Sequence, residues 1–244
     1  MAHPASLDRG ALAEAVDAIQ MQYGTAIGNA IVDVIAQCDD AFLAREQDHE
    51  NLLDLLARAG MGVLWLDNQS GCKGVCEGLP AQSVDPATAP GLCADGLCLD
   101  EALLDSLEAQ LRSAKGTHVL VLHQLGSHGP SYFRRYPTSF ARFQPACRYD
   151  DLRRCSVEEI VNAYDNTLLY TDHLLAKMIQ RLQAAAEVDT ALLYVSDHGE
   201  SLGEGNLFLH GMPYAIAPAT QTEVPMLMWF SAGYRQSAAL DLAC

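Results

Sequence analysis

Two short polar segments near the carboxyl end of the chain carry side chains that can bind metal ions. Asp197 and His198 follow an apolar run at 191–195 after a single serine, and His210 lies a short distance further along, before a glycine. A strand that ends in Asp-His-Gly places a carboxylate and an imidazole at its carboxyl end, where α/β folds bind ligands and metals. Because zinc accepts oxygen and nitrogen ligands at nearly equal distances, the pair predicts a zinc site. The alternative is structural: Asp197 would cap the next segment and His198 would be an ordinary loop histidine.

A second group of polar residues follows two earlier apolar runs. His123 and His128 end or follow the run at 118–123, and Lys73 lies on a tight, glycine-flanked loop. With the two histidines named above, four of the chain's eight histidines lie just past strand ends or in the same set of loops. Together with Asp197 they predict a metal or phosphate site. Taken singly, each could be an ordinary loop histidine, and Lys73 could be a solvated lysine.

The elements that must position these residues alternate between strands and helices. Short apolar runs typical of buried strands are found at 62–66, 118–123, 191–196 and 224–230. Helical periodicity indicates helices at 11–37, 51–59, 100–114 and 156–186. Pro225 can only stand at the start of the last strand. Ser156 and Glu159 are expected to form a capping box at the start of the last helix. The segment 77–99 is expected to be a loop. Strands separated by helices predict an α/β fold, an α/β/α sandwich with a mainly parallel central sheet and its chemistry beyond the strands' carboxyl ends.

The composition describes an acidic, globular chain. Its 244 residues are enough for one large α/β domain, and 50% of them are hydrophobic. The formal net charge is -16, which argues against nucleic acid as a partner because little positive charge is available to neutralise phosphates. The sequence contains no apolar run of 18 residues, so no membrane span is predicted. Its first residues do not have the pattern of a signal segment. A phosphate-bearing substrate would need local positive charge from a metal ion or from a few Lys and His side chains.

Most of the eight cysteines fall into close pairs along the chain. The pairs are Cys72 and Cys76, Cys93 and Cys98, and Cys147 and Cys155. Three small local disulfides are expected, which favours an oxidising compartment. The alternative is zinc binding, because the first pair has nearly the spacing of a zinc finger, although the companion ligands of a finger are missing. Cys38 and Cys244 are left over.

Four motifs, in order, resemble those of a known enzyme family. They are Ser70-Gly71-Cys72-Lys73-Gly74-Val75, His123-Gln124-Leu125-Gly126-Ser127-His128-Gly129-Pro130, Asn162-Ala163-Tyr164-Asp165-Asn166, and Val195 to Glu204 followed by His210-Gly211-Met212-Pro213. They look like the periplasmic domain of phosphoethanolamine–lipid A transferases, which include the mobile colistin-resistance enzymes and belong to the alkaline phosphatase/sulfatase superfamily. The resemblance implies a catalytic domain over 39–231, after an atypical helical segment at 1–38 and before a divergent tail at 232–244.

The resemblance also implies a reaction: zinc-dependent transfer of phosphoethanolamine from phosphatidylethanolamine to a lipid A phosphate, by way of a threonine. Asp197 and His198 would be zinc ligands. His128 and His210 would serve the phosphoryl group or a second zinc, and Lys73 would contact the substrate. Zinc would lower the pKa of the attacking alkoxide and stabilise charge on the phosphoryl oxygens. The three cysteine pairs match disulfides of the family.

The family also implies where such an enzyme works. Its members act at the periplasmic face of the bacterial inner membrane and reach their lipids through a membrane-embedded helical domain. We expect that domain to be absent from this chain, and we expect a monomer.

The chain departs from the family pattern at several points. The remaining zinc ligands of the family are a Glu that ends the first strand and the nucleophilic threonine, but no counterpart of that strand is found before residue 11. Thr25 is the only candidate nucleophile, at about the right distance before Glu50, and its flanking residues do not match. Gln69 stands where the family usually has Asn, and the chain diverges after Ser231. We therefore expect an enzyme fragment, incomplete at both ends, that binds zinc weakly and has little activity alone.

Two other functions stay open. A phosphodiesterase or sulfatase of the same superfamily would pass the group to water, although the Lys73 loop and the cysteine pairs argue against it. A non-catalytic remnant would only bind metal. An assay with a lipid-phosphate acceptor separates a transferase from a hydrolase, and zinc titration tests the metal site itself.

Overall fold

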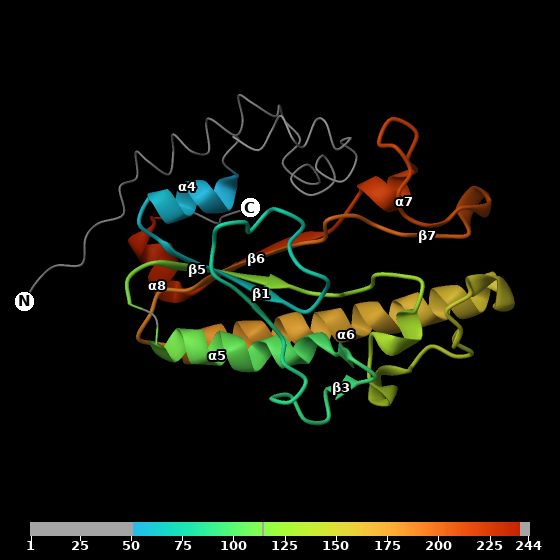
Figure 1. The fold of residues 1–244 in the computed structure, drawn as a ribbon, viewed down its shortest axis with the longest axis horizontal. Coiled ribbons are helices and arrows are strands. Elements are labelled where there is room, and N and C mark those ends of the chain that lie inside the picture. The colour runs from blue at the N-terminus through green and yellow to red at the C-terminus, as the bar shows by residue number, and fades with distance from the viewer. Residues whose placement is uncertain (1–50, 114, 240–244) are drawn as a thin grey trace, which may run out of the picture.

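The computed structural model describes residues 51–113 and 115–239. The helix expected over 11–37, the segment 1–38 and the candidate nucleophile Thr25 lie outside the described residues. Figure 1 shows the strands in the middle of the molecule, with helix α4 on one side and helices α5 and α6 on the other. Helices therefore flank both faces of the strands, as the α/β/α prediction requires.

A parallel sheet of three strands, in the order β2-β1-β5, forms one half of the middle layer. Its members are β1 (Gly62–Asp67), β2 (Ala81–Ser83) and β5 (His118–His123). β1 lies between the other two and is almost wholly buried, which explains its unbroken apolar sequence. β1 and β5 run in register from Gly62 opposite His118 to Asp67 opposite His123. Asp67 and His123 therefore end their strands side by side at the carboxyl edge of the sheet.

An antiparallel pair of strands forms the other half. β6 (Ala191–Val195) and β9 (Met226–Phe230) pair from end to end. β9 begins directly after Pro225, which has no N–H to donate to a ladder. The antiparallel direction of β9 is the exception in the mainly parallel arrangement that the sequence predicts. Periodicity reports burial and does not encode the direction of a strand.

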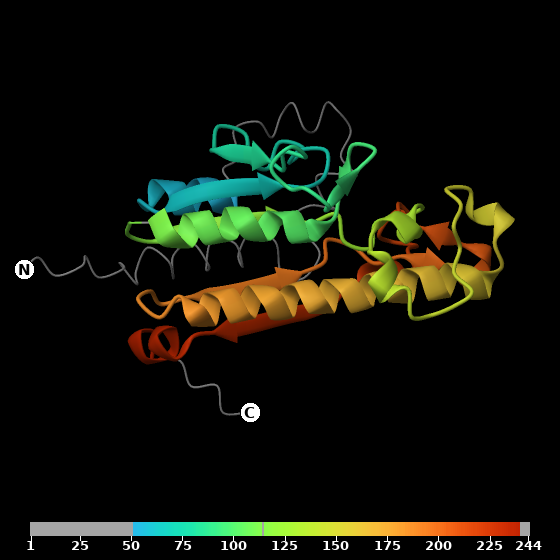
Figure 2. The same cartoon turned by 90° about the horizontal axis from the view of Figure 1, so that it is seen from below.

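Two long helices cover one face of both halves. α5 (Leu103–Ser113) and α6 (Val157–Ala184) share a hydrophobic cluster with side chains of β5, β6 and β9. Its buried members are Leu104, Leu107, Leu174, Leu175, Met178 and Leu182. Within each helix these residues are spaced by one to four positions, so they lie on one side of it. Figure 2 shows α6 running alongside β6.

Alternate residues of β1 contact the two layers of helices. Leu66 packs with Leu103 of α5. Trp65 points to the opposite side, where it packs with Leu53 of α4 (Leu52–Arg58). Because successive side chains of a strand point to opposite faces, one apolar strand holds both layers together.

Helix α6 begins at the capping box that the sequence predicts. The hydroxyl of Ser156 accepts the backbone N–H of Glu159 at 3.2 Å, and the Glu159 carboxylate accepts the N–H of Ser156 at 2.7 Å. Helix α4 begins in the same way, at Asn51 and Asp54. Both boxes satisfy N–H groups that the first turn of a helix leaves without a partner.

The segment 77–99 is not the plain loop that we expected. It contributes the edge strand β2 and a hairpin of β3 (Cys93–Ala94) and β4 (Leu97–Cys98). These strands have two or three residues each, too few to produce a periodic pattern. The remaining elements are η1 (Asp100–Ala102), η2 (Tyr132–Arg134), η3 (Thr138–Phe140), η4 (Leu152–Arg154), β7 (Ser201–Leu202), η5 (Glu204–Asn206), β8 (Phe208–Leu209), α7 (Ala219–Thr222) and α8 (Ala232–Ser237).

All three cysteine pairs form disulfides in the structure. The bonds join Cys72 to Cys76, Cys93 to Cys98, and Cys147 to Cys155. The prediction of local disulfides is confirmed. The zinc-finger alternative is wrong for these cysteines, because a sulfur that is bonded to another sulfur offers no thiolate to a metal.

No helix in the described part of the chain is both long enough and apolar enough to cross a bilayer. The longest, α6, has 28 residues, but charged side chains such as Asp165 and Lys177 occur along it.

Removing the capping box of α6 should destabilise the fold. In Ser156→Ala the N–H of Glu159 loses its acceptor, and we expect the free energy of unfolding to fall by about 1 kcal/mol. Urea unfolding followed by circular dichroism measures the change. Ser113→Ala, at the exposed end of α5, is the control and should change that free energy by less than about 0.5 kcal/mol. Equal losses in the two variants would contradict the role of the cap.

Candidate metal and phosphate site

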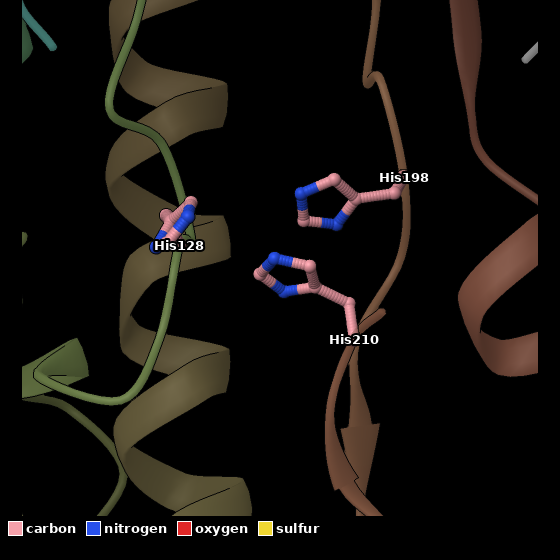
Figure 3. A group of neighbouring side chains, drawn as sticks. All are labelled: His128, His198 and His210. Atoms are coloured by element: carbon pink, nitrogen blue, oxygen red, sulfur yellow. The ribbon is translucent and has the colours of Figure 1, made fainter. Parts of the chain in front are cut away.

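Three histidines from three different loops meet at one point (Figure 3). His128 follows β5, His198 follows β6 and His210 follows β8. Each offers a ring nitrogen, and the three nitrogens lie within 4.8 Å of one another. The rings of His198 and His210 stack with their centroids 3.8 Å apart, and the ring of His128 stands edge-on to both. The structure therefore brings together three of the residues that the sequence singles out.

Hydrogen bonds decide which nitrogen of each ring carries the proton. Nδ1 of His128 and Nδ1 of His198 lie 2.7 Å and 3.0 Å from the carbonyl oxygen of the following residue. Nδ1 of His210 lies 3.1 Å from the carboxylate of Glu200. Since carbonyl and carboxylate oxygens accept hydrogen bonds, Nδ1 is the donor in all three rings. In the neutral ring the lone pair that can bind a metal then lies on Nε2.

Glu200 is a buried side chain that accepts hydrogen bonds from several residues around the cluster. Its side chain is 3% exposed, and its Oε1 accepts the N–H of Gly129 and the Nδ1–H of His210, both at 3.1 Å. Its Oε2 accepts the hydroxyl of Tyr132 at 3.2 Å, and burial together with this carboxylate raises the pKa of Tyr132. Sequence reasoning did not single out Glu200, although it lies in the same motif, two residues after His198.

Burial also affects the protonation of the cluster. It lowers the pKa of the His128 ring below its usual range, and the neighbouring His210 and His198 lower it further. The Gly129 carbonyl and Glu200 act in the opposite direction without reversing the shift. His128 is therefore held in the neutral form, the form that can bind a metal ion.

Asp197 lies at the rim of the cluster. Its side chain is 42% exposed, and its Oδ1 lies 3.9 Å from Nε2 of His198. The same oxygen accepts the backbone N–H of His198 at 3.1 Å, and the hydroxyl of Ser196 donates to the His198 carbonyl at 2.7 Å. One ion with bonds of about 2.0–2.1 Å to each ligand can span the two side chains. The carboxylate of Asp197 and the imidazole of His198 can thus bind the same ion, as expected for adjacent residues that lead into a glycine turn.

The glycine of the Asp-His-Gly sequence is required by packing. A Cβ on Gly199 would lie 2.1 Å from the backbone oxygen of Thr220. The N–H of Gly199 donates to the carbonyl of Gln221 at 2.9 Å, so the two chain segments touch here. The side-chain amide of Gln221 also donates to the hydroxyl of Ser201 at 2.9 Å. These contacts hold the loop that carries His198 against α7.

Lys73 lies on a different loop, the one that follows β1. Its side chain is exposed and its backbone φ is 46°. Gly71 and Gly74, on either side of it in the loop, also have positive φ angles, of 89° and 94°. A disulfide from Cys72 to Cys76 closes the loop. The role of Lys73 in substrate binding stays a prediction.

Polar side chains tie the loop after β1 to the loop after β5. The amide of Asn68 donates to Asp100 at 2.7 Å, and Asp100 accepts the two backbone N–H groups of 125–126 at 2.8 Å each. The amide of Gln69 donates to the carbonyl of Gln124 at 2.7 Å. Burial raises the pKa of Asp100 in spite of these bonds. The turn that leads to His128 is therefore fixed by Asp100 of η1 and by Gln69 of the loop after β1.

The donor set fits a zinc ion. Imidazole nitrogens are preferred zinc ligands, and a carboxylate such as that of Asp197 is a common additional one. Metal-bound histidines usually donate their other N–H to a carboxylate or a backbone carbonyl, as His210 and His198 do here. A site of this kind can hold a cation and, through it, a phosphoryl group.

Comparison with known proteins places the chain in a family. A family model described as sulfatase matches residues 29–241. The chain belongs to the sulfatase family. The matched region contains the parallel sheet, the antiparallel strand pair and the three-histidine cluster.

Within this family the chain is similar to phosphoethanolamine transferases, as the motifs predict. It is 48% identical over 206 residues to phosphoethanolamine transferase EptA of Salmonella typhimurium, a match that covers 84% of this chain and 37% of the relative. It is 46% identical over 188 residues to phosphatidylethanolamine transferase Mcr-1 of Escherichia coli, covering 74% of this chain and 35% of the relative. The chain thus spans little more than a third of the length of these curated relatives.

Solved structures give the same result for the fold. The soluble domain of lipooligosaccharide phosphoethanolamine transferase A from Neisseria meningitidis has a TM-score of 0.78 and 43% identity, covering 84% of this chain and 61% of that chain. The periplasmic domain of EptC from Escherichia coli, solved in complex with Zn, has a TM-score of 0.64 and 21% identity, covering 80% and 56%. The second likeness shows the fold alone. The predicted alkaline phosphatase/sulfatase-like α/β fold is confirmed.

Zinc titration tests the cluster directly. Calorimetric titration of the full chain should show zinc binding that His198→Ala weakens by more than about 100-fold, because even outer hydrogen bonds to metal-bound histidines contribute 10–100-fold. His118→Ala, at the far end of β5, should bind zinc like the wild type. Identical titrations of the wild type and His198→Ala would rule out a metal site at this cluster.

Glu200 should contribute to metal binding without touching the metal. In Glu200→Gln an amide N–H replaces an acceptor beside His210, so we expect zinc affinity to fall by about 10–100-fold. Glu187→Gln, at an exposed position, is the matched control. Circular dichroism of both variants establishes that they are folded, and an unchanged zinc affinity in folded Glu200→Gln would contradict the prediction.

Proposed function

We propose that this chain is the catalytic part of a zinc-dependent phosphoethanolamine transferase, which moves phosphoethanolamine from phosphatidylethanolamine to a lipid A phosphate. One observation carries the proposal. Three histidines with their Nδ1 protons fixed by hydrogen bonds meet beside an aspartate, in a chain similar to EptA and Mcr-1.

Each site residue has a proposed role. Asp197 and His198 hold the zinc ion, and His128 and His210 bind the transferred phosphoryl group or a second zinc. Lys73, exposed on its loop, contacts the anionic substrate. Bound zinc would neutralise charge that develops on the phosphoryl oxygens and lower the pKa of the attacking hydroxyl. Thr25, outside the described residues, is the candidate for that hydroxyl.

The cellular setting is part of the same proposal. Three disulfides support an oxidising compartment, and we place the chain at the periplasmic face of the bacterial inner membrane. A similar structure is described as an integral membrane protein, lipooligosaccharide phosphoethanolamine transferase A. A membrane domain of that kind would bring the site to its lipid substrates. The acidic chain acts as a monomer and does not bind nucleic acid.

Hydrolysis is the second candidate, because the family model that matches the chain is that of the sulfatases. A hydrolase would use the same zinc site but pass the group to water. The two functions differ in whether the rate of donor cleavage depends on the acceptor lipid.

A lipid assay separates the possibilities. The full chain is incubated with zinc and with vesicles of phosphatidylethanolamine, with and without lipid A, and diacylglycerol release is measured. We expect slow release that continues beyond one equivalent per chain only with lipid A. It should fall by about 100-fold in His128→Asn, the size of effect seen when one group that stabilises charge in a transition state is removed.

Two results would contradict the proposal. Release that is equally fast without lipid A would identify a hydrolase. Intact zinc binding with no release from any vesicle would identify a metal-binding remnant.

A further inference from the structure

A second histidine outside the three-histidine cluster is paired with a buried carboxylate. Nδ1 of His123 lies 2.6 Å from Oδ1 of Asp67. The two residues are register partners at the last positions of β5 and β1, so their side chains leave the same face of the sheet. The side chain of Asp67 is 6% exposed and that of His123 is 24% exposed. The carboxylate is therefore inside the protein, and the imidazole reaches toward its surface.

Asp67 is held as an anion by donors on three sides. Besides His123, the N–H of Gly71 donates to its Oδ2 at 2.9 Å and the indole N–H of Trp65 donates to its Oδ1 at 3.4 Å. Burial acts to raise the pKa of Asp67, but the hydrogen bonds from His123, Gly71 and Trp65 outweigh it and hold the pKa below its usual range. An ionised carboxylate only accepts, so Nδ1 of His123 is the donor.

This arrangement aims the other nitrogen of His123 away from Asp67. A carboxylate that fixes the Nδ1–H of an imidazole leaves Nε2 to give or take a proton, which is how a general acid–base histidine is oriented. The ring also packs against Trp65, with centroids 4.9 Å apart, so its plane is fixed. A histidine with a set tautomer and a set orientation is prepared for proton transfer.

Hydrogen bonds and the chain itself link the pair to two parts of the proposed site. Through Gly71, Asp67 holds the loop that carries Lys73. His123 begins the segment, fixed at 125–126 by Asp100, that leads to His128. The same carboxylate thus joins the Lys73 loop to the segment that enters the three-histidine cluster.

We propose that His123 is a proton-transfer residue of the transferase, and that Asp67 positions it. The inference rests on the function proposed above and deepens it. Over one transfer, the P–O bond to the donor alcohol breaks and a P–O bond to the acceptor forms. In the first half of the cycle the attacking hydroxyl, as its alkoxide, bonds to phosphorus, and His123, protonated on both nitrogens, gives its Nε2 proton to the departing alcohol oxygen. In the second half an oxygen of the acceptor phosphate replaces that alkoxide on phosphorus, and the proton of the acceptor returns to Nε2 of His123, so protons balance over the cycle.

The leaving group provides a sharp test. Diacylglycerol is a poor leaving group that needs a proton, whereas 4-nitrophenolate leaves without one. The full chain with zinc is assayed on phosphatidylethanolamine vesicles containing lipid A and on 4-nitrophenyl phosphoethanolamine. His123→Gln should slow diacylglycerol release by about 100-fold, within the range of general acid–base catalysis. We expect it to slow nitrophenol release by less than about threefold, because no general acid is needed there.

Two further variants complete the experiment. His118→Gln changes the histidine at the opposite, exposed end of the same strand and should leave both rates unchanged. Asp67→Asn keeps the shape but removes the charge that orients His123. It should reproduce the selective loss on the lipid substrate, while circular dichroism remains that of the wild type.

Each outcome decides the inference. Equal losses on both substrates in His123→Gln would show a structural role and overturn the inference while leaving the transferase function standing. Unchanged rates in a folded His123→Gln would overturn it as well. A wild-type chain that releases alcohol from neither substrate would instead overturn the proposed function, and the inference with it.

Discussion

The geometry of the site depends on one buried carboxylate, that of Glu200. The three histidines come from separate loops, so they meet only if those loops are held against one another. Glu200 does this by accepting hydrogen bonds from Gly129, Tyr132 and His210, which belong to two distant parts of the chain. An ion that is 3% exposed must find donors, because an unpaired buried charge is strongly destabilising. The requirement to satisfy Glu200 therefore fixes the ring of His210 and the backbone next to His128.

Two more buried carboxylates, near the carboxyl edge of the parallel sheet, also require hydrogen-bond donors. Asp67 and Asp100 are both buried, and backbone or side-chain N–H groups from the adjoining loops donate to them. The loops after β1 and β5 are thus joined to the sheet and to each other by acceptors that cannot be left without donors. Functional side chains on loops gain precision when such hydrogen bonds fix their backbone. The buried carboxylates orient groups, and the exposed side chains are left for chemistry.

The strands, the helices and the histidines could be predicted because their signals are local. Apolar runs identify β1 and β5, the Ser156–Glu159 pair marks the start of α6, and Asp197-His198 follows its strand within one motif. The antiparallel direction of β9 and the short strand β2 could not be predicted, because pairing partners far apart in sequence decide them. Glu200 was missed for the same reason. Two of its three donors, Gly129 and Tyr132, lie about 70 residues away, and no spacing rule links an acceptor to donors at that distance.

The proposed division of the site into a metal half and a substrate half has a physical consequence. In their neutral forms the three imidazoles supply lone pairs but no positive charge, and burial keeps His128 in that form. The chain as a whole carries a formal net charge of -16, so its long-range field repels a phosphate. Arg135, whose Nε donates to the carbonyl of His128 at 3.1 Å, supplies positive charge beside the cluster, and a cation held by the rings would supply it within the cluster. If Asp197 and His198 hold that cation, phosphate binding at His128 and His210 depends on it, and the two halves act as one unit.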